Sequence, residues 1–167
     1  LVGVRRRVRT EQGLTVPVMP VRDASDPDVV LVPALGANMP DTLAARLARS
    51  DVADAVVAIR QWSNAAAVIG AACTGTFVLA ESALLDGQRA TTSWWLAPMF
   101  RQRYPRVSLD DSRMLVTSAG FTTAGAALAC ACTGAFGPDF SEGERNPSTK
   151  SSRRPAGPGA SGGGGIT

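Results

Sequence analysis

The sequence predicts an α/β fold in which parallel strands alternate with helical crossovers. Over about residues 1–130 of the 167, short β-branched runs alternate with longer stretches of Ala, Leu and Arg, a pattern typical of strands joined by helices. The run at 29–32 is apolar at every position, which indicates a parallel strand with helices on both faces. The length allows one ordinary domain.

Two earlier strands are expected ahead of this buried one. Residues 1–8 and 14–18 are rich in β-branched side chains, and Gln12-Gly13 between them is a turn signal. We expect both strands to be more exposed than the strand at 29–32.

Two helices are predicted next along the chain. Asp41 is a candidate N-cap for a helix over residues 42–49, and Asp51 starts a second helix that runs to about residue 62. Apolar residues repeat along one side of both segments. They are Leu43, Leu47, Val52, Ala55 and Val56. We assign that side to the core.

A strand, a tight turn and a helix follow. Residues 67–72 predict a third strand of small and apolar side chains, and residues 77–85 predict a helix. Asp86-Gly87 is a helix-closing signal. The turn between the strand and the helix therefore falls at Cys73.

Cys73 stands where a nucleophile elbow would place its reactive side chain. Ala71, Ala72 and Gly75 are small enough for the strand and helix backbones to approach each other. A thiol there projects from the carboxyl end of the sheet, where α/β folds bind ligands. The start of the helix favours a thiolate and offers amide donors for an oxyanion. The alternative is a buried structural cysteine, as most free cysteines are.

The composition excludes several kinds of site. The chain has no histidine, so the usual general base and the commonest metal ligand are absent from it. Three cysteines do not form a disulfide framework, and Cys130 and Cys132 are too close for an unstrained bridge. These two thiols without a third ligand make a weak metal site. We therefore predict neither a metal nor a cofactor.

The charge is nearly balanced, with 17 Lys and Arg against 14 Asp and Glu, and Arg supplies all the positive charges except Lys150. The one dense cluster lies at residues 5–9. It fits either a nucleic-acid contact or a solvated strand edge, and we favour the edge because the other bases are dispersed among acids. Apolar runs fall short of the roughly 18 residues of a membrane span, and the arginines follow the apolar start instead of preceding it as in a secretory signal. We expect no membrane partner and a cytoplasmic location.

Other conspicuous side chains receive structural assignments. Trp62 and Trp95 are expected in helix packing, and Glu81 at a surface position. Adjacent carboxylates at Asp110 and Asp111 point apart on a loop, so we expect them to cap or to be solvated.

The composition changes after about residue 130. Residues 131–167 hold nine of the 17 glycines and four of the 11 prolines. Such a segment does not bury a core. We predict a folded domain over residues 1–130 and a flexible tail over 131–167.

Six segments in order carry a family resemblance. They read VLVPALG (30–36), GAACTGTFVLAE (70–81), LLDGQRATTSWW (84–95), RYP (103–105), DDSRM (110–114) and TTAGA (122–126). Together they resemble the ThiJ/PfpI superfamily, and most closely the class I glutamine amidotransferase-like domain that opens many AraC-type transcriptional regulators. The resemblance implies a flavodoxin-like three-layer sandwich with a mainly parallel sheet.

The resemblance also implies a pocket at the elbow. Its candidate ligand-binding residues are Gly36, Cys73, Thr74, Ser93 and Trp94. In catalytic relatives the thiol is assisted by an acid from the first strand-helix unit and often by a histidine, at whose position this chain has Ser93. A lone thiol is a poor hydrolase, so Cys73 is a candidate nucleophile without its partners.

The match is incomplete at both ends. Leu1 aligns with the second strand of the family, so the first strand and its acid are missing, and the last apolar helix is lost after about Ala129. We interpret the sequence as a fragment with a late start and a shifted reading frame.

The leading functional hypothesis is a non-catalytic sensory domain of an AraC-type regulator. It would bind a small-molecule effector and form a homodimer, and DNA would be bound only through a helix-turn-helix domain missing from these residues. The alternative is a ThiJ/PfpI-type enzyme, an amidase, isonitrile hydratase or glyoxalase/deglycase-like protein, that uses Cys73. A third hypothesis is redox sensing through a Cys73 sulfenic acid.

Overall fold

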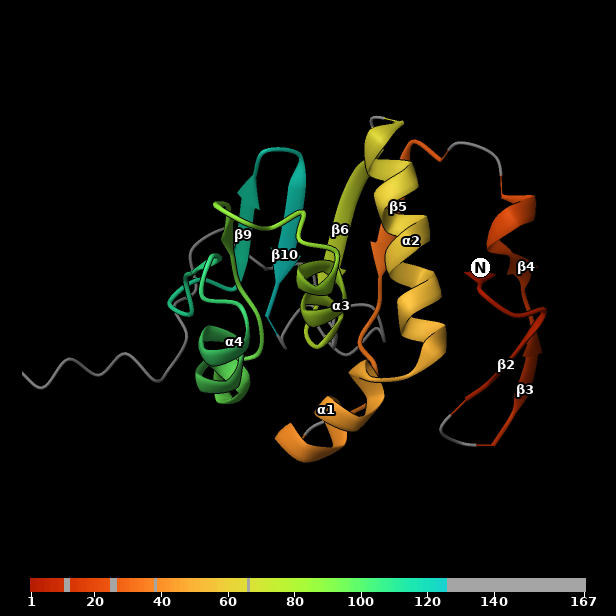
Figure 1. Ribbon diagram of the computed structural model, residues 1–167, viewed down its shortest axis with the longest axis horizontal. Coiled ribbons are helices and arrows are strands. Elements are labelled where there is room, and N and C mark those ends of the chain that lie inside the picture. Colours follow the sequence, from red (N-terminus) through yellow and green to blue (C-terminus); the bar gives the residue numbers. More distant parts are fainter. Residues whose placement is uncertain (11–12, 25–26, 38, 66, 126–167) are drawn as a thin grey trace, which may run out of the picture.

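The computed structural model describes residues 1–10, 13–24, 27–37, 39–65 and 67–125 (Figure 1). Its centre is a four-stranded sheet in the order β5-β6-β10-β9. These strands are β5 (Val29–Val32), β6 (Val68–Ala72), β10 (Phe121–Ala124) and β9 (Leu115–Ser118). Both β5 and β10 run parallel to β6, and β9 is antiparallel to β10. The predicted α/β fold with a mainly parallel sheet is confirmed.

The N-terminal strands form two small pairs away from the central sheet (Figure 1). Strand β1 (Val2–Gly3) pairs in parallel with β4 (Met19–Pro20), which leads into a 3-10 turn, η1 (Val21–Asp23). Strands β2 (Arg7–Arg9) and β3 (Thr15–Pro17) form an antiparallel hairpin. The single strand predicted over residues 1–8 is wrong, because the chain divides into β1 and β2 with different partners.

Four helices lie among the described residues. They are α1 (Pro40–Leu47), α2 (Ser50–Asn64), α3 (Gly75–Glu81) and α4 (Ala97–Arg103), the last preceded by a 3-10 turn, η2 (Trp94–Leu96). A further short parallel pair, β7 (Arg89–Ala90) with β8 (Ser108–Leu109), flanks α4 in the chain.

The predicted helix boundaries need correction. Helix α1 starts at Pro40 with Met39 as its N-cap, because proline at the first helical position has a suitable φ and no amide to satisfy. Asp41 is therefore inside the helix. Helix α2 likewise begins before Asp51, whose carboxylate pairs instead with Arg49 at 2.7 Å.

Helix α3 also differs from the predicted segment at 77–85. It begins at Gly75 and ends at Glu81. Two residues later, Ala83 takes a left-handed φ of 60°, which breaks the α-helical backbone. Leu85 is nevertheless completely buried, so it belongs to the core without belonging to the helix.

Packing against helices buries one face of the central sheet. The buried side chains of this face include Val32, Ile69 and Val116, one from each of three strands. Helix α3 packs against both β5 and β6 (Figure 1). The opposite face is open in the described residues, where Val29 and Leu31 are 67% and 60% exposed. The expectation that helices cover the strand at 29–32 on both faces is therefore not met by the described part of the chain.

An aromatic cluster anchors α3 to α4. The ring of Phe77, fully buried, lies edge-on to that of Phe100 with centroids 5.0 Å apart. Tyr104 packs against both rings and donates a 2.6 Å hydrogen bond to Glu81 Oε1, which also pairs with Arg103 at 2.7 Å. Burial, followed by the Glu81 contact, raises the pKa of Tyr104. Glu81 is thus half-buried in a polar cluster instead of being a plain surface residue.

Two predictions concern residues that the structure does not describe. The tail at 131–167 and the domain boundary at 130 lie outside the described residues. Within the described part of the chain, none of the helices combines the length and apolar character needed to cross a bilayer.

The close approach of α3 to β5 depends on Gly75. A Cβ atom at this position would lie 2.5 Å from the carbonyl oxygen of Val32 and 2.6 Å from that of Pro33. Both are backbone atoms, so neither moves without shifting the end of β5. Glycine is therefore required for the first turn of α3 to sit against the carboxyl end of the strand.

We predict that Gly75→Ala destabilises the protein by about 3 kcal/mol, because the added methyl overpacks a rigid backbone contact. Gly70→Ala is the matched control, since its Cβ would meet the movable tip of Leu31 at 3.2 Å. Urea unfolding followed by circular dichroism measures both variants. Equal stability losses in the two would show that the approach at Gly75 is not constraining.

Candidate functional site

The candidate site is built on the turn between β6 and α3. Cys73 has a φ of 53°, a left-handed conformation that L-residues adopt only under constraint. Its amide donates to the Ala124 carbonyl at 2.8 Å, and its carbonyl accepts from the Thr92 hydroxyl at 2.8 Å. The backbone of Cys73 is therefore held from two sides in a left-handed turn between β6 and α3.

The thiol of Cys73 has a hydroxyl partner. Its Sγ lies 2.8 Å from Ser93 Oγ, and either atom is able to donate. Cys73 is 7% exposed and Ser93 is completely buried. The structure thus brings together the two predicted site residues that are 20 positions apart in the sequence.

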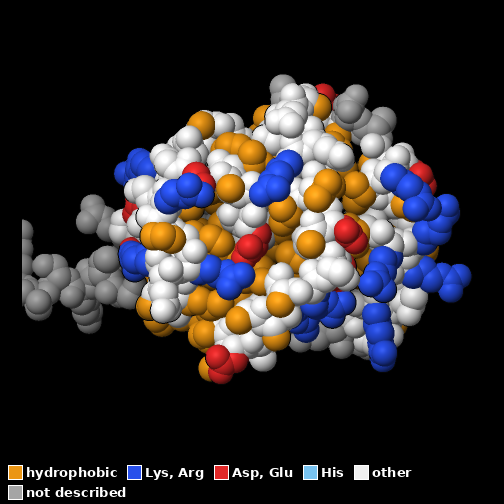
Figure 2. All heavy atoms as spheres, viewed as in Figure 1, with side chains coloured by type: hydrophobic (Ala, Val, Ile, Leu, Met, Phe, Trp, Pro, Cys, Tyr) orange, Lys and Arg blue, Asp and Glu red, His pale blue; other side chains and the backbone are white. Residues whose placement is uncertain are grey.

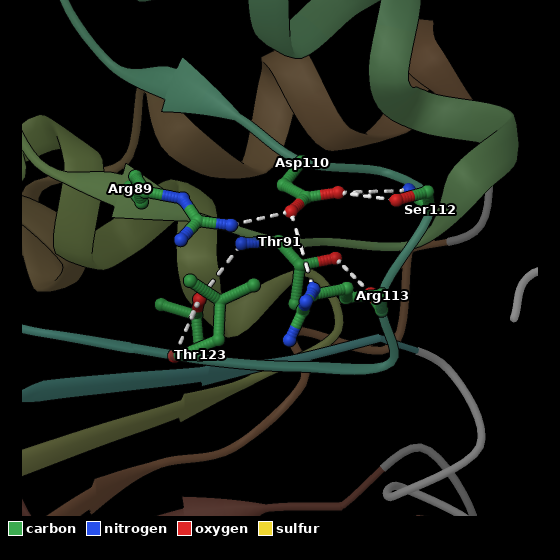
Figure 3. A network of polar contacts seen from close by, with 7 residues as sticks. Arg89, Thr91, Asp110, Ser112, Arg113 and Thr123 are labelled. Carbon is green, nitrogen blue, oxygen red and sulfur yellow. Dashed lines mark hydrogen bonds and ion pairs between the residues drawn. The ribbon is translucent and has the colours of Figure 1, made fainter. Parts of the chain in front are cut away.

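A second set of contacts fixes the segment that carries Ser93. The Thr91 amide donates to Thr123 Oγ1 at 2.8 Å, and the Thr91 hydroxyl donates to the Arg113 carbonyl at 2.7 Å (Figure 3). Because Thr123 belongs to β10, these bonds tie the chain after β7 to the central sheet. The hydroxyl of Ser93 is consequently positioned by its neighbours' bonds as well as by its own.

Asp110 forms further polar contacts beside the Thr91 hydrogen bonds, nearer the surface. Its carboxylate accepts from Ser112 Oγ at 2.6 Å and pairs with Arg89 at 2.7 Å, with Arg113 farther away at 3.7 Å (Figure 3). The hydrogen bond from Ser112 first, and the Arg89 contact after it, lower the pKa of Asp110 against the opposing effect of burial. Asp111 instead pairs with Arg101 at 2.9 Å, so the two adjacent carboxylates have different partners.

The other predicted site residues lie around the turn in different roles. Thr74 is buried and its Oγ1 accepts a 2.8 Å bond from the Leu35 amide, which joins the elbow to the loop after β5. Gly36 in that loop has a φ of 66°. Trp94 is 49% exposed and lies edge-on to Trp95, with centroids 5.8 Å apart. The hydrogen bond of Thr74 therefore links the turn to the loop, whereas the ring contact of Trp94 is with Trp95.

Sequence reasoning missed the hydroxyl residues that support the pair. Thr91, Thr92 and Thr123 are buried, and each has a hydrogen bond that holds the elbow or the Ser93 segment. The run Thr91-Thr92-Ser93 is visible in the sequence, but nothing local shows that these hydroxyls are buried and therefore need partners. Thr76 is also buried, and its Oγ1 has no partner among the described residues.

The described residues contain no acid or base bonded to the Cys73 thiol. Glu81 is the acid on the helix that follows Cys73. It lies at the far end of α3, where its carboxylate accepts hydrogen bonds from Tyr104 and Arg103. No group of three or more metal-ligating side chains occurs in the described part of the chain, and Cys130 and Cys132 lie outside it. The partner of the thiol among the described residues is therefore a hydroxyl, which is not a general base near neutral pH.

Comparisons with known proteins relate the sequence and the fold of this chain to others. No family model matches the sequence. The HTH-type transcriptional regulator CdhR of Pseudomonas aeruginosa is 34% identical over 67 residues, which are 40% of this chain and 20% of the regulator. The chain therefore matches about a fifth of the length of this curated relative.

Solved structures are similar over a larger share of the chain. An AraC family transcriptional regulator from Pseudomonas putida superposes with a TM-score of 0.51 at 14% identity, covering 77% of this chain and 65% of that one. A thiJ/pfpI family protein from Bacillus anthracis gives 0.57 at 17% identity, covering 77% and 58%. The fold is thus the flavodoxin-like fold of ThiJ/PfpI proteins and of AraC-family regulators, as the resemblance implied.

We predict that Ser93→Ala destabilises the protein by about 1 kcal/mol, because it removes the partner of a buried thiol. Ser118→Ala is the control, since it removes a hydroxyl whose 3.0 Å bond to Gln88 is only partly buried. Urea denaturation measures both. A Ser93→Ala loss no larger than that of the control would mean that the Cys73 contact contributes nothing.

The Asp110 network predicts a pH dependence of stability. The folded-state pKa of Asp110 lies below its usual value, so the stabilisation is present above that usual value and is lost as the pH falls through the folded pKa. Asp110→Asn should therefore lose less stability than the wild type on acidification. Asp54→Asn, at an exposed position of α2, makes the same charge change elsewhere. Chemical denaturation at a series of pH values compares the three proteins, and identical profiles for Asp110→Asn and wild type would contradict the assignment.

Proposed function

We propose that residues 1–130 are the ligand-sensing and dimerisation domain of an AraC-type transcriptional regulator, and that Cys73 does not catalyse a reaction. The observation that carries this proposal is the 2.8 Å contact between Cys73 Sγ and Ser93 Oγ. A buried thiol beside a hydroxyl has hydrogen-bonding capacity for a ligand, and the described part of the chain offers it no base to take its proton.

The support around the pair favours a rigid binding site. Backbone and hydroxyl bonds from Thr92 and Thr91 hold both sides of the contact, and Thr74 holds the loop that contains Gly36. Preorganised polar groups bind a small molecule with little ordering cost. The effector site is therefore proposed between the elbow and this loop, with Gly36, Thr74 and Trp94 as its remaining candidate residues.

Dimerisation and DNA binding are the other parts of the proposal. The exposed apolar side chains of the open sheet face, Val29, Leu31 and Val68, are a surface that a second copy would cover. DNA reading is assigned to a helix-turn-helix domain outside this chain, in keeping with the regulators it resembles, and the location to the cytoplasm.

A ThiJ/PfpI-type enzyme remains the second candidate because the φ of Cys73 is that of a nucleophile elbow. Such an enzyme would activate the thiol by a route other than the Ser93 hydroxyl, through bound water or an acid supplied by another segment. The two candidates differ in one measurable property, which is turnover that depends on Cys73.

We predict no such turnover. The purified chain is incubated with glutamine, methylglyoxal and a simple alkyl isonitrile, and product formation is compared with Cys73→Ala, since a thiol without a base is a weak nucleophile. Cys130→Ala is the control for effects of losing any thiol. Turnover of one of these substrates that Cys73→Ala abolishes and Cys130→Ala preserves would replace the sensory proposal by the enzymatic one.

A further inference from the structure

The hairpin of β2 and β3 carries an exposed group of arginines, here called the arginine ribbon. Its members are Arg5, Arg6, Arg7 and Arg9, and all four are exposed. Figure 2 shows Lys and Arg side chains gathered at the end of the molecule where Figure 1 places β2 and β3. The ribbon is therefore a surface feature at the edge of the fold and not part of the core.

The net charge of the chain is concentrated in this region. Residues 1–24 contain five arginines and two acids, Glu11 and Asp23, which is a net charge of +3. The whole chain also has a formal charge of +3. The other 143 residues, with 12 bases and 12 acids, consequently have no net charge. The net positive electrostatic potential of the protein therefore comes from residues 1–24.

Within the described ranges, the ribbon arginines differ from other arginines in having no carboxylate partner. Arg101, Arg103 and Arg106 each lie within 3 Å of a carboxylate oxygen. Among the described residues, no carboxylate lies within 4 Å of a ribbon guanidinium. Arg5 makes only a minor contribution to the lowered pKa of Asp51, which comes first from the hydrogen bond to Arg49.

The shape of the hairpin and the chemistry of its side chains favour duplex DNA over other anionic partners. Arg7 and Arg9 are two residues apart on one strand, so their side chains share a face. A two-stranded ribbon fits the major groove of B-form DNA, whereas the major groove of duplex RNA is too narrow. Guanidinium groups bind phosphate through paired hydrogen bonds, and residues 1–24 contain no aromatic side chain to stack on unpaired bases or enter a membrane interface.

We propose that the arginine ribbon binds the phosphate backbone of duplex DNA without reading its sequence. This function goes beyond ligand sensing at Cys73 and does not depend on it. The sequence alone favoured a solvated strand edge. The structure adds that all four arginines are exposed and that, in the part of the chain it describes, none of them has a carboxylate within 4 Å. In a regulator, such contacts would hold the sensory domain against DNA next to a site read elsewhere.

The test is a salt titration of binding to a fluorescently labelled short duplex of random sequence, measured by anisotropy with the full chain. Four phosphate contacts predict that log K falls with log salt with a slope of about −3.6. The variant Arg6→Gln/Arg7→Gln/Arg9→Gln leaves one contact and should reduce the slope to about −0.9. Arg6→Lys/Arg7→Lys/Arg9→Lys keeps the charge and should keep most of the slope.

The matched control is Arg101→Gln/Arg106→Gln/Arg113→Gln, which removes the same charge from paired positions and should leave the slope unchanged. Circular dichroism establishes that each variant is folded. If the triple Gln variant is not folded, the single variants Arg7→Gln and Arg9→Gln replace it, and each should reduce the magnitude of the slope by about 0.9. Absence of binding at low salt, or equal loss in the Gln variant and the control, would overturn the proposal. Tighter binding of the wild type to phosphatidylserine vesicles than to duplex would overturn it in favour of a membrane surface.

Discussion

A single close contact between backbones organises the described structure. The first turn of α3 passes the carbonyl oxygens of Val32 and Pro33 at a distance that only Gly75 allows. This contact sets the end of β5 beside the elbow, so that Thr74 reaches the loop amide of Leu35. The same contact accounts for the left-handed turn at Cys73. The chain must turn sharply between the end of β6 and a helix that lies so near the sheet.

The polar contacts around Cys73 and Ser93 form two layers. Hydroxyls hold the inner layer at Cys73 and Ser93, where burial makes each hydrogen bond strong and each missing one costly. Ion pairs hold the outer layer, where Arg89 and Asp110 are partly exposed and screened by solvent. The inner layer thus holds the thiol and ties its supporting segment to the sheet, and the outer layer links β7 to the chain after β8.

Local sequence patterns predicted β5, β6 and the turn at Cys73, because an apolar strand and a small-residue turn are encoded by neighbouring residues, but they did not predict β9 and β10. They failed at helix ends, where Pro40 and Ala83 act through backbone geometry that periodicity does not register. The contact of Cys73 with Ser93 came from the family resemblance, since no spacing rule joins two turns 20 residues apart. The roles of Thr91 and Thr123 depend on tertiary pairing and had no local signal strong enough to assign them.

The position of β5 at the edge of the sheet has a consequence for backbone dynamics. Within the described residues β5 pairs only with β6, while β6 and β10 each have two neighbours. The amides of β5 that point away from β6 exchange with solvent without the loss of an inter-strand hydrogen bond. The amides of β6 exchange only when the hydrogen bonds to its neighbouring strands break. Hydrogen exchange is therefore expected to be graded across the sheet, with β6, the strand that leads into Cys73, the slowest to exchange.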